Sequence, residues 1–432
     1  MSNLVLFVLF VLSLILFRRA FLSSKLPMIK ICLAIYFVNF LLGHVILTFY
    51  RLLFRPDSYI LLADLRLLES KLDIKFLLFL NIAQFLLVCL GTLISGDRYV
   101  KDNEPEIKFF SRDLTTAIIL MTLVGWIGNI AVYFGNVNIF SAFHPFELLG
   151  TAWLVSGFRL INFKKFILIA IASSHFIWAV FIFKSKSEAF LILVALAIRF
   201  LHSKTKVRIY QISAISLVGI LLFPFIQVQK GILTLSKIQN QLDSQGEQFT
   251  FLKSFGLSFL QRFDGADSIT DAYSASAGSW YTPIEYMRVI LSKLIPNISF
   301  LLGDYFGENT STTSSLGQMW NDQMRTISIE KVTYGIPVTF GPMAEGYAIS
   351  GMILGLFLCL TFGIIMKKLC SACYSQKLFS VTCGFYYMCH LENLQNSIGS
   401  TILMAPKMLE CYLVLRIFQI FSSKPIVRFL SN

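Results

Sequence analysis

The sequence predicts an all-α polytopic integral membrane protein with about eleven transmembrane helices and one large extracytoplasmic loop. Of its 432 residues, 56% are hydrophobic and only 14% are charged, whereas soluble domains carry roughly a quarter charged residues. The mean hydropathy is +0.70. Apolar runs of nearly membrane-spanning length recur from one end of the chain to the other, which argues against a soluble globular enzyme.

Membrane spans are expected where an apolar run approaches about 20 residues, the length of a helix that crosses the hydrocarbon core. The first run has no positive segment before it and no small-residue cleavage site after it, so a retained span is expected instead of a signal peptide. Two runs, 146–162 and 188–201, are short or carry polar residues and could be tilted, broken or re-entrant. The predicted spans are 2–17, 28–50, 76–95, 114–134, 146–162, 166–183, 188–201, 209–226, 341–366, 378–396 and 400–420.

Basic residues in the short loops predict the orientation, because cytoplasmic loops are rich in Lys and Arg. With these spans, every strongly basic loop falls on one side, which is therefore assigned to the cytoplasm. The N-terminus and the remaining loops then face outward. The basic segments are 18–25, 97–108, Lys164 with Lys165, 202–208, 367–377 and the tail from Lys424 to Arg428.

The predicted organisation has three parts. An N-terminal transmembrane bundle occupies 1–226, a large outward loop occupies 227–340, and C-terminal transmembrane helices occupy 341–432. A long segment without a span is usually functional. The loop also holds two amphipathic stretches, 251–263 and 284–303, of the kind that can lie in the membrane interface.

Composition argues against several function classes. The net charge of +13 is explained by orientation signals, and no basic cluster interleaved with aromatics suggests nucleic-acid binding. The eight cysteines lie mostly in apolar spans, and the lone CxxC at Cys370 and Cys373 lacks the further ligands of a metal site. No P-loop, HExxH or nucleophile elbow is present.

A carboxylate, Glu345, lies in VTFGPMAEGYAISGMILGLFL (338–358), where an apolar span begins. The surrounding Pro and Gly prevent a regular helix before about residue 343, so Glu345 is expected in the first turn of the following helix. The positive end of the helix dipole favours an acid there. The helix dipole explains an acid at this position, but it does not explain why so many Gly and Pro residues surround it.

Acidic residues also cluster in the large loop, in QRFDGADSITDAY (261–273). Asp264, Asp267 and Asp271 follow a spacing that places them roughly on one helical face beside Gly265. Oxygen ligands of this kind can hold a divalent cation. Helix capping and a solvated loop face are the alternative, and the residue types favour it.

Cations on the outward side suggest an anionic ligand such as phosphate or pyrophosphate. Outward turns should be poor in Lys, yet the turn 183–190 carries Lys184 and Lys186 beside Glu188. The other outward cations are Arg262, Arg288, Lys293 and Arg325.

Histidines are few, and three of the five, His44, His175 and His390, fall in or near spans, where buried hydrogen-bonded histidines are the usual case. His144 instead lies on the outward side, beside Pro145 and near Glu147, and it is the histidine kept as a catalytic candidate.

Taken together, the layout, RFDGADS inside the loop and PVTFGPMAEGYAISGMILG at its exit resemble the Wzy-type O-antigen and capsule repeat-unit polymerases. Members carry an Arg-Phe-Asx-Gly-x-Asp-like string and a Pro…Gly-Glu-x-Tyr…Gly-x-x-Gly string. Here Gly346 follows Glu345 where the family has Gly before Glu, and Ala-Ile-Ser-Gly follows Tyr347 where it has Asn-Phe-Gly. The specific motifs cover about forty residues, and the layout covers the whole chain.

The resemblance implies a glycosyltransferase of the bacterial inner membrane with its large loop in the periplasm. It would polymerise oligosaccharide repeat units carried on undecaprenyl pyrophosphate, without metal, nucleotide sugar or other cofactor. The expected partners are that lipid-linked oligosaccharide, the lipid bilayer and a chain-length regulator protein, with no nucleic acid.

The implied site combines residues from distant parts of the chain. Glu345, Asp264 or His144 would serve as the base or its orienting partner. Tyr347 and Trp280 would stack on sugar. The pyrophosphate would be held by Lys184, Lys186, Arg262, Arg288 and Arg325.

Two other readings stay open at this point. An O-antigen ligase shares both chemistry and layout with the polymerase. A non-enzymatic transporter or flippase for a lipid-linked glycan would place polar residues within its spans and show two related halves. No internal repeat is visible in the sequence.

Overall fold

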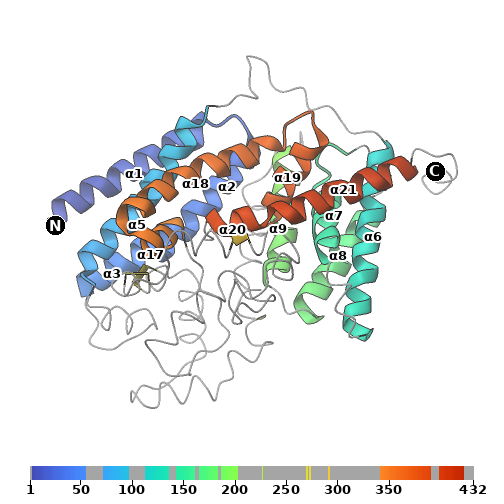
Figure 1. The fold of residues 1–432 in the computed structure, drawn as a ribbon, viewed down its shortest axis with the longest axis horizontal. Coiled ribbons are helices and arrows are strands. Elements are labelled where there is room, and N and C mark those ends of the chain that lie inside the picture. The colour runs from blue at the N-terminus through green and yellow to red at the C-terminus, as the bar shows by residue number, and fades with distance from the viewer. Residues whose placement is uncertain are drawn as a thin grey trace, which may run out of the picture.

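The computed structural model describes residues 2–54, 72–96, 112–135, 143–160, 165–182, 186–202, 226, 269–270, 272–273, 290–291, 341–390 and 398–422. Within these ranges the regular structure is entirely helical (Figure 1). Six of the described helices are long and apolar enough to cross a membrane: 3–23, 27–53, 74–94, 113–135, 352–372 and 398–422. These findings support an all-α membrane protein.

The N-terminal part of the chain forms a set of long helices that pack lengthwise. It contains α1 (Asn3–Ser23), α2 (Pro27–Val38), the π-helix η1 (Asn39–Ile46), α3 (Leu47–Phe54) and α5 (Ile74–Ile94). Residues that favour helix ends mark the boundaries, because Ser2 accepts a hydrogen bond from the Val5 N–H and Asp73 from the Lys75 N–H. Pro27 starts α2, as proline favours the first turn.

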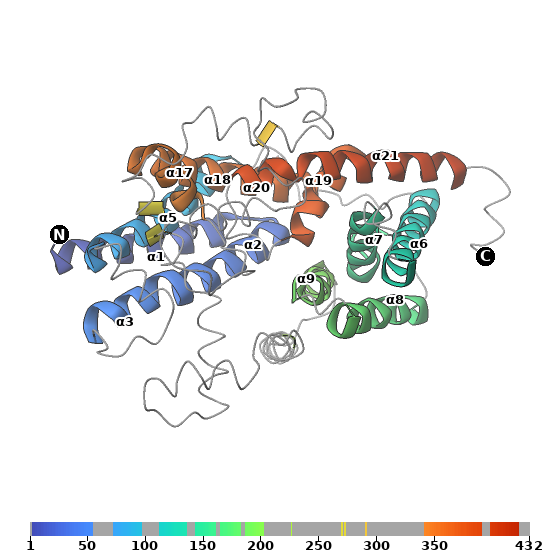
Figure 2. The same ribbon diagram turned by 60° about the horizontal axis from the view of Figure 1, so that its bottom comes forward.

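The middle part forms a separate group of helices, best seen end-on in Figure 2. It contains α6 (Arg112–Gly135), α7 (His144–Ser156), α8 (Lys165–Ile177), the π-helix η3 (Trp178–Ile182) and α9 (Lys186–His202). On α6 and α7, Gly125 meets Glu147 while Thr122 meets Gly150, so the two helices run antiparallel. The 13-residue α7 is about 20 Å long, short of the roughly 30 Å hydrocarbon core.

The C-terminal part contains α17 (Pro342–Ser350), α18 (Met352–Ala372), α19 (Leu378–Cys389), α20 (Ile398–Leu403) and α21 (Ala405–Ser422). The predicted continuous span 341–366 is wrong. Gly351, with a φ of 81°, ends α17, and α17 folds back along α18 so that Gly346 abuts the backbone of Gly355. In a straight helix these two residues would be about 13 Å apart.

Close backbone contacts hold the long helices together. A Cβ on Gly91 of α5 would collide with the Leu360 carbonyl, and one on Gly363 of α18 would collide with the Val88 carbonyl. Small residues that let backbones approach are a feature of membrane helix interfaces. Large apolar side chains on α1, α6, α18 and α21 are instead exposed, including Leu4, Phe134, Ile353 and Ile420, and they suit a lipid environment.

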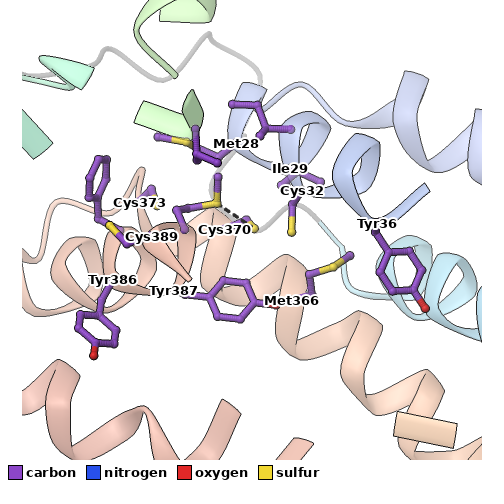
Figure 3. Packing of buried hydrophobic residues seen from close by; sticks show 14 of the residues in the cluster. Met28, Ile29, Cys32, Tyr36, Met366, Cys370, Cys373, Tyr386, Tyr387 and Cys389 are labelled. Atoms are coloured by element: carbon purple, nitrogen blue, oxygen red, sulfur yellow. Dashed lines mark hydrogen bonds between the residues drawn. The ribbon is translucent and has the colours of Figure 1, made fainter. Parts of the chain in front are cut away.

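Sulfur-containing side chains fill the core where α2, α18 and α19 meet (Figure 3). Cys32, Cys370, Cys373 and Cys389 are buried there, and the Cys370 Sγ lies 3.7 Å from the Met388 Sδ. All eight cysteines are unpaired and all except Cys383 are buried. This agrees with the prediction that they act as small hydrophobic residues.

Much of the predicted large loop, and the predicted span 209–226 apart from Ile226, lies outside the described residues. A short part of the loop is described and packs into the helical core. Ile269, Thr270 and Ala272 are buried, and the ring of Tyr273 lies 5.8 Å from that of Tyr347. The segment after RFDGADS therefore contacts the helix that carries Glu345.

Candidate functional site

Polar side chains converge where one end of α6 meets α7, η3 and α9. The antiparallel order places the end of α6, the start of α7, the end of α8 and the start of α9 together, as the contacts between their side chains confirm. We call Asn129, His144, Glu147, His175 and Glu188 the His–Glu cluster. Charged and polar groups inside a membrane protein are costly and usually functional.

A buried ion pair forms the inner end of the cluster. The Nδ1 of His175 lies 2.6 Å from the Glu147 Oε1, and both side chains are only 1% exposed. The Thr151 hydroxyl donates a second hydrogen bond to the same carboxylate at 2.8 Å. The carboxylate is thus held by a charge and by a hydroxyl, as buried charges require.

Both ring nitrogens of His175 face acceptors. The Nε2 lies 3.1 Å from the backbone carbonyl of Glu188, and a carbonyl cannot donate a hydrogen bond. With Nδ1 on a carboxylate, the ring satisfies both contacts by carrying two protons. We therefore assign His175 as an imidazolium that links α8 to α7 and α9.

The outer end of the cluster is a second histidine–glutamate pair. The His144 Nδ1 lies 3.1 Å from the Asn129 Oδ1, and its Nε2 lies 3.4 Å from the Glu188 Oε1. The His144 side chain is 31% exposed and that of Glu188 is 11% exposed. Exposure therefore falls steadily from His144 to the inner pair, so His144 and Glu188 are the members that a ligand can reach.

Two polar atoms of the cluster have no hydrogen-bond partner within the described part of the chain. They are the Oε2 of Glu188 and the Nδ2 of Asn129, both buried. Because buried polar atoms normally find partners, these two provide an acceptor and a donor for a bound molecule. The acceptor belongs to the carboxylate that already contacts His144.

Glycines bring the helices close enough for these contacts. A Cβ on Gly125 would lie 2.5 Å from the Glu147 Cβ and still closer to its backbone nitrogen. A Cβ on Gly150 would collide with the Thr122 hydroxyl. Backbone contact between α6 and α7 thus fixes the position of Glu147 along the axis of α6. This register in turn sets which side chains of the cluster can meet.

Helices from the C-terminal part border the same region. The ring of His390, just after α19, stacks on Tyr386 at 4.4 Å and interacts electrostatically with His144. On α21, the Cys411 Sγ lies 3.9 Å from the Pro145 carbonyl. His144 is therefore surrounded by helices from both halves of the chain.

Glu345 lies elsewhere, with α17, on the opposite side of the ribbon from α6 and α7 (Figures 1 and 2). It sits in the first turn of α17, as predicted, and is completely buried. Its Oε2 accepts a hydrogen bond from the Ile398 N–H at 2.7 Å and its Oε1 from the Gly399 N–H at 2.9 Å. Both oxygens thus hold the start of α20, which gives Glu345 an anchoring role.

Most of the other predicted site residues cannot be placed. Tyr347 is partly buried and contacts Tyr273. Lys186 begins α9, but its side chain lies outside the described residues. Also outside them are Lys184, Arg262, Asp264, Asp267, Asp271, Trp280, Arg288, Lys293 and Arg325. The convergence of Lys184, Lys186, Arg262, Arg288 and Arg325 on a pyrophosphate stays a prediction.

Sequence reasoning found His144 but not its partners. His175 was expected to be buried and hydrogen-bonded, and it is, but its link to Glu147 was not foreseen; Glu188 was expected as part of an outward turn. The available signal was the polar face of α6, where Thr122, Trp126, Asn129 and Tyr133 follow helical spacing within an apolar span. Within the described ranges, no group of three or more His, Cys, Asp or Glu side chains is arranged to hold a metal ion.

The His–Glu cluster can therefore accept a proton at the Glu188 carboxylate near the positive charge of the His175 imidazolium. It offers a carboxylate acceptor in Glu188, with the His144 ring 3.4 Å from that carboxylate and the His175 ring on the Glu188 backbone carbonyl. Searches of protein-family models, curated proteins and solved structures gave no match for this chain.

Proposed function

We propose that the protein is a membrane glycosyltransferase that joins oligosaccharide units carried on a polyprenyl pyrophosphate, as the resemblance to the Wzy-type polymerases implies. The observation that carries the proposal is the part-exposed His144–Glu188 pair, whose buried Glu188 Oε2 has no partner within the described residues, in an apolar helical protein. Glycosyl transfer without a metal needs a base for the attacking hydroxyl and positive charge near the leaving pyrophosphate.

In the proposed step, a hydroxyl oxygen of the acceptor glycan attacks the anomeric carbon of the donor. The new C–O bond forms as the bond to the pyrophosphate oxygen breaks, and that oxygen keeps the electron pair. The hydroxyl proton passes to the Glu188 Oε2. His144 then returns this proton to solvent, because it is the more exposed member of the pair.

The inner pair, His175 and Glu147, supports this chemistry by holding Glu188 in place. His175 holds the backbone carbonyl of Glu188 and the side chain of Glu147 at the same time. The start of α9 is thereby fixed relative to α7, so the Glu188 carboxylate stays beside His144. His175 is a positioning residue in this account, and Glu345 anchors α20.

The proposed orientation places this end of α6–α9 on the periplasmic side. The opposite end carries Arg159 and Arg199, whose guanidinium groups bond to backbone carbonyls of Ser375 and Val155. Basic residues at that end follow the rule for cytoplasmic ends. The transporter alternative would need polar groups that continue across the bilayer, whereas the His–Glu cluster is gathered at one end of its helices.

The test is the glycan ladder made by cells that depend on this protein. His144→Gln and Glu188→Gln should remove long chains while the protein remains in the membrane. Glu410→Gln is the matched control, because Glu410 is a half-exposed carboxylate paired with Lys407. A normal ladder from both cluster variants would refute the proposal, and polymer of normal length with loss of its attachment to lipid would favour the ligase.

A further inference from the structure

Three aromatic side chains line the His–Glu cluster. The rings of Trp126 and Trp178 lie 5.4 Å apart at 80°, and those of Tyr133 and Trp178 lie 5.8 Å apart at 66°. Trp126 also meets the ring of His175 edge-on at 6.4 Å. We call Trp126, Tyr133 and Trp178 the aromatic wall.

The aromatic wall belongs to the same surface as the polar groups. Trp126, Asn129 and Tyr133 are three and four residues apart on α6, so they share one face of the helix. That face points to α7 and η3, since Asn129 contacts His144 and Tyr133 contacts Trp178.

The lipid-facing stripe of α6 is a different one. It is formed by exposed apolar side chains with their own helical spacing, namely Leu123, Ile127, Ile130 and Phe134. Tyr133 is nevertheless 53% exposed, at the end of α6 where the helices of the cluster meet. The wall is therefore open at that end, and its position differs from that of an aromatic belt that faces lipid.

The geometry of the rings and the two polar atoms without partners within the described residues indicate the kind of ligand that this surface could bind. None of the three rings is stacked face to face on another, because each contact is edge-on. A flat, weakly polar surface with C–H groups suits the negative face of an aromatic ring. In the cluster that Trp126 contacts, the Asn129 Nδ2 and the Glu188 Oε2 lack partners within the described residues, and a donor and an acceptor together match a hydroxyl-bearing ring.

We propose that the aromatic wall, with Asn129 and Glu188, forms a subsite that binds one pyranose ring of the glycan next to the acid–base pair. The inference rests on the proposed function for the identity of the glycan. It adds the place where the sugar lies and the residues that select a sugar over a lipid headgroup. In this arrangement a hydroxyl of the bound ring contacts the Glu188 carboxylate.

The experiment is a calorimetric titration of the full-length protein in lipid nanodiscs with three probes. These are lipid-linked glycan from the producing cells, the free glycan released from it by mild acid, and undecaprenyl pyrophosphate without glycan. Both glycan-bearing probes should bind. Tyr133→Ala and Trp178→Ala should each weaken binding of the free glycan by between about two- and tenfold.

The matched control is Ile127→Ala, on the lipid-facing stripe of α6, and it should bind the free glycan normally. Equal binding of undecaprenyl pyrophosphate and lipid-linked glycan, with equal losses of affinity in Ile127→Ala and Tyr133→Ala, would show that the wall contacts lipid and would overturn the proposal. Absence of a binding heat when the original protein is titrated with the free glycan would also overturn the proposal.

The two proposals fail in different ways. Glu188→Gln keeps a polar side chain, so it should still bind free glycan to within a few-fold while transfer is lost. If Glu188→Gln transfers glycan normally but the aromatic variants bind it weakly, the subsite stands and the proposed chemistry is wrong. If transfer is lost and the aromatic variants bind glycan normally, the chemistry stands and the subsite is wrong.

Discussion

Replacing His175 with Phe isolates the contribution of the buried ion pair. The change removes hydrogen bonds to the Glu147 Oε1 at 2.6 Å and to the Glu188 carbonyl at 3.1 Å. Glu147 would keep only the Thr151 hydroxyl of its observed partners. A flat ring remains at the position, so the edge-on contact with Trp126 can be kept and the volume changes little.

The expected loss of folding stability follows from the burial of both His175 and Glu147, whose side chains are each 1% exposed. Breaking one side of a buried pair costs about 3–5 kcal/mol, because the remaining charge stays buried without compensation. Glu147→Met should cost a similar amount, since it leaves the imidazolium without its carboxylate. The double variant carries neither charge, and its stability should return to within about 1–2 kcal/mol of the original protein.

The assay is reversible unfolding in mixed micelles, followed by helical circular dichroism as the fraction of denaturing detergent is raised. Lys407→Ala with Glu410→Ala serves as the control cycle, since that pair is 39% exposed on both sides and should contribute less than about 1 kcal/mol. Two outcomes would refute the assignment of a buried charged pair. In the first, His175→Phe and Glu147→Met each lower the free energy of unfolding by less than about 1 kcal/mol. In the second, the double variant lowers it by the sum of the two single losses.

Three further predictions concern other parts of the structure. Gly125→Ala should lower the melting temperature and glycan transfer together, because the new Cβ meets Glu147; Gly96→Ala, where nothing lies within 4 Å, should lower neither. Glu345→Gln should lower the free energy of unfolding by about 1–3 kcal/mol, because an NH2 donor replaces one of the two oxygens that accept from the N–H groups of Ile398 and Gly399; a melting curve unchanged from the original would contradict the anchoring role. A thiol-reactive maleimide should label Cys383 before any other cysteine in the folded protein, because the other seven are buried; mass spectrometry would show the order, and early labelling of Cys370 or Cys373 would contradict the packing in Figure 3.

Helix positions could be predicted where the backbone chemistry is local. Pro and Gly around Glu345 predicted a helix starting near residue 343, and α17 begins at Pro342. Apolar length alone missed the break at Gly351, because no charged residue lies between Tyr347 and Met366. A glycine with positive φ at this point turns the chain back, and hydropathy carries no information on φ.

The site could be predicted only in part because its contacts cross between helices. His144 was named as a candidate because it lies on the predicted outward side, next to Pro145 and near Glu147. Its partner Glu188 is 44 positions away in the sequence, and pairing them requires α9 to pack beside α7. Similarly, the helix dipole accounts for an acid at Glu345, but the sequence does not show that this acid holds another helix 53 residues away.

The central claim is that the Glu188 carboxylate takes the proton of the attacking hydroxyl. The direct measurement is the rate at which the purified protein in proteoliposomes releases undecaprenyl pyrophosphate from lipid-linked glycan, compared between the original chain and Glu188→Gln. Loss of a general base predicts a rate lower by about 10²–10⁴-fold, with glycan still bound. A rate for Glu188→Gln within about threefold of the original would contradict the claim, since general-base loss should cost at least about a hundredfold.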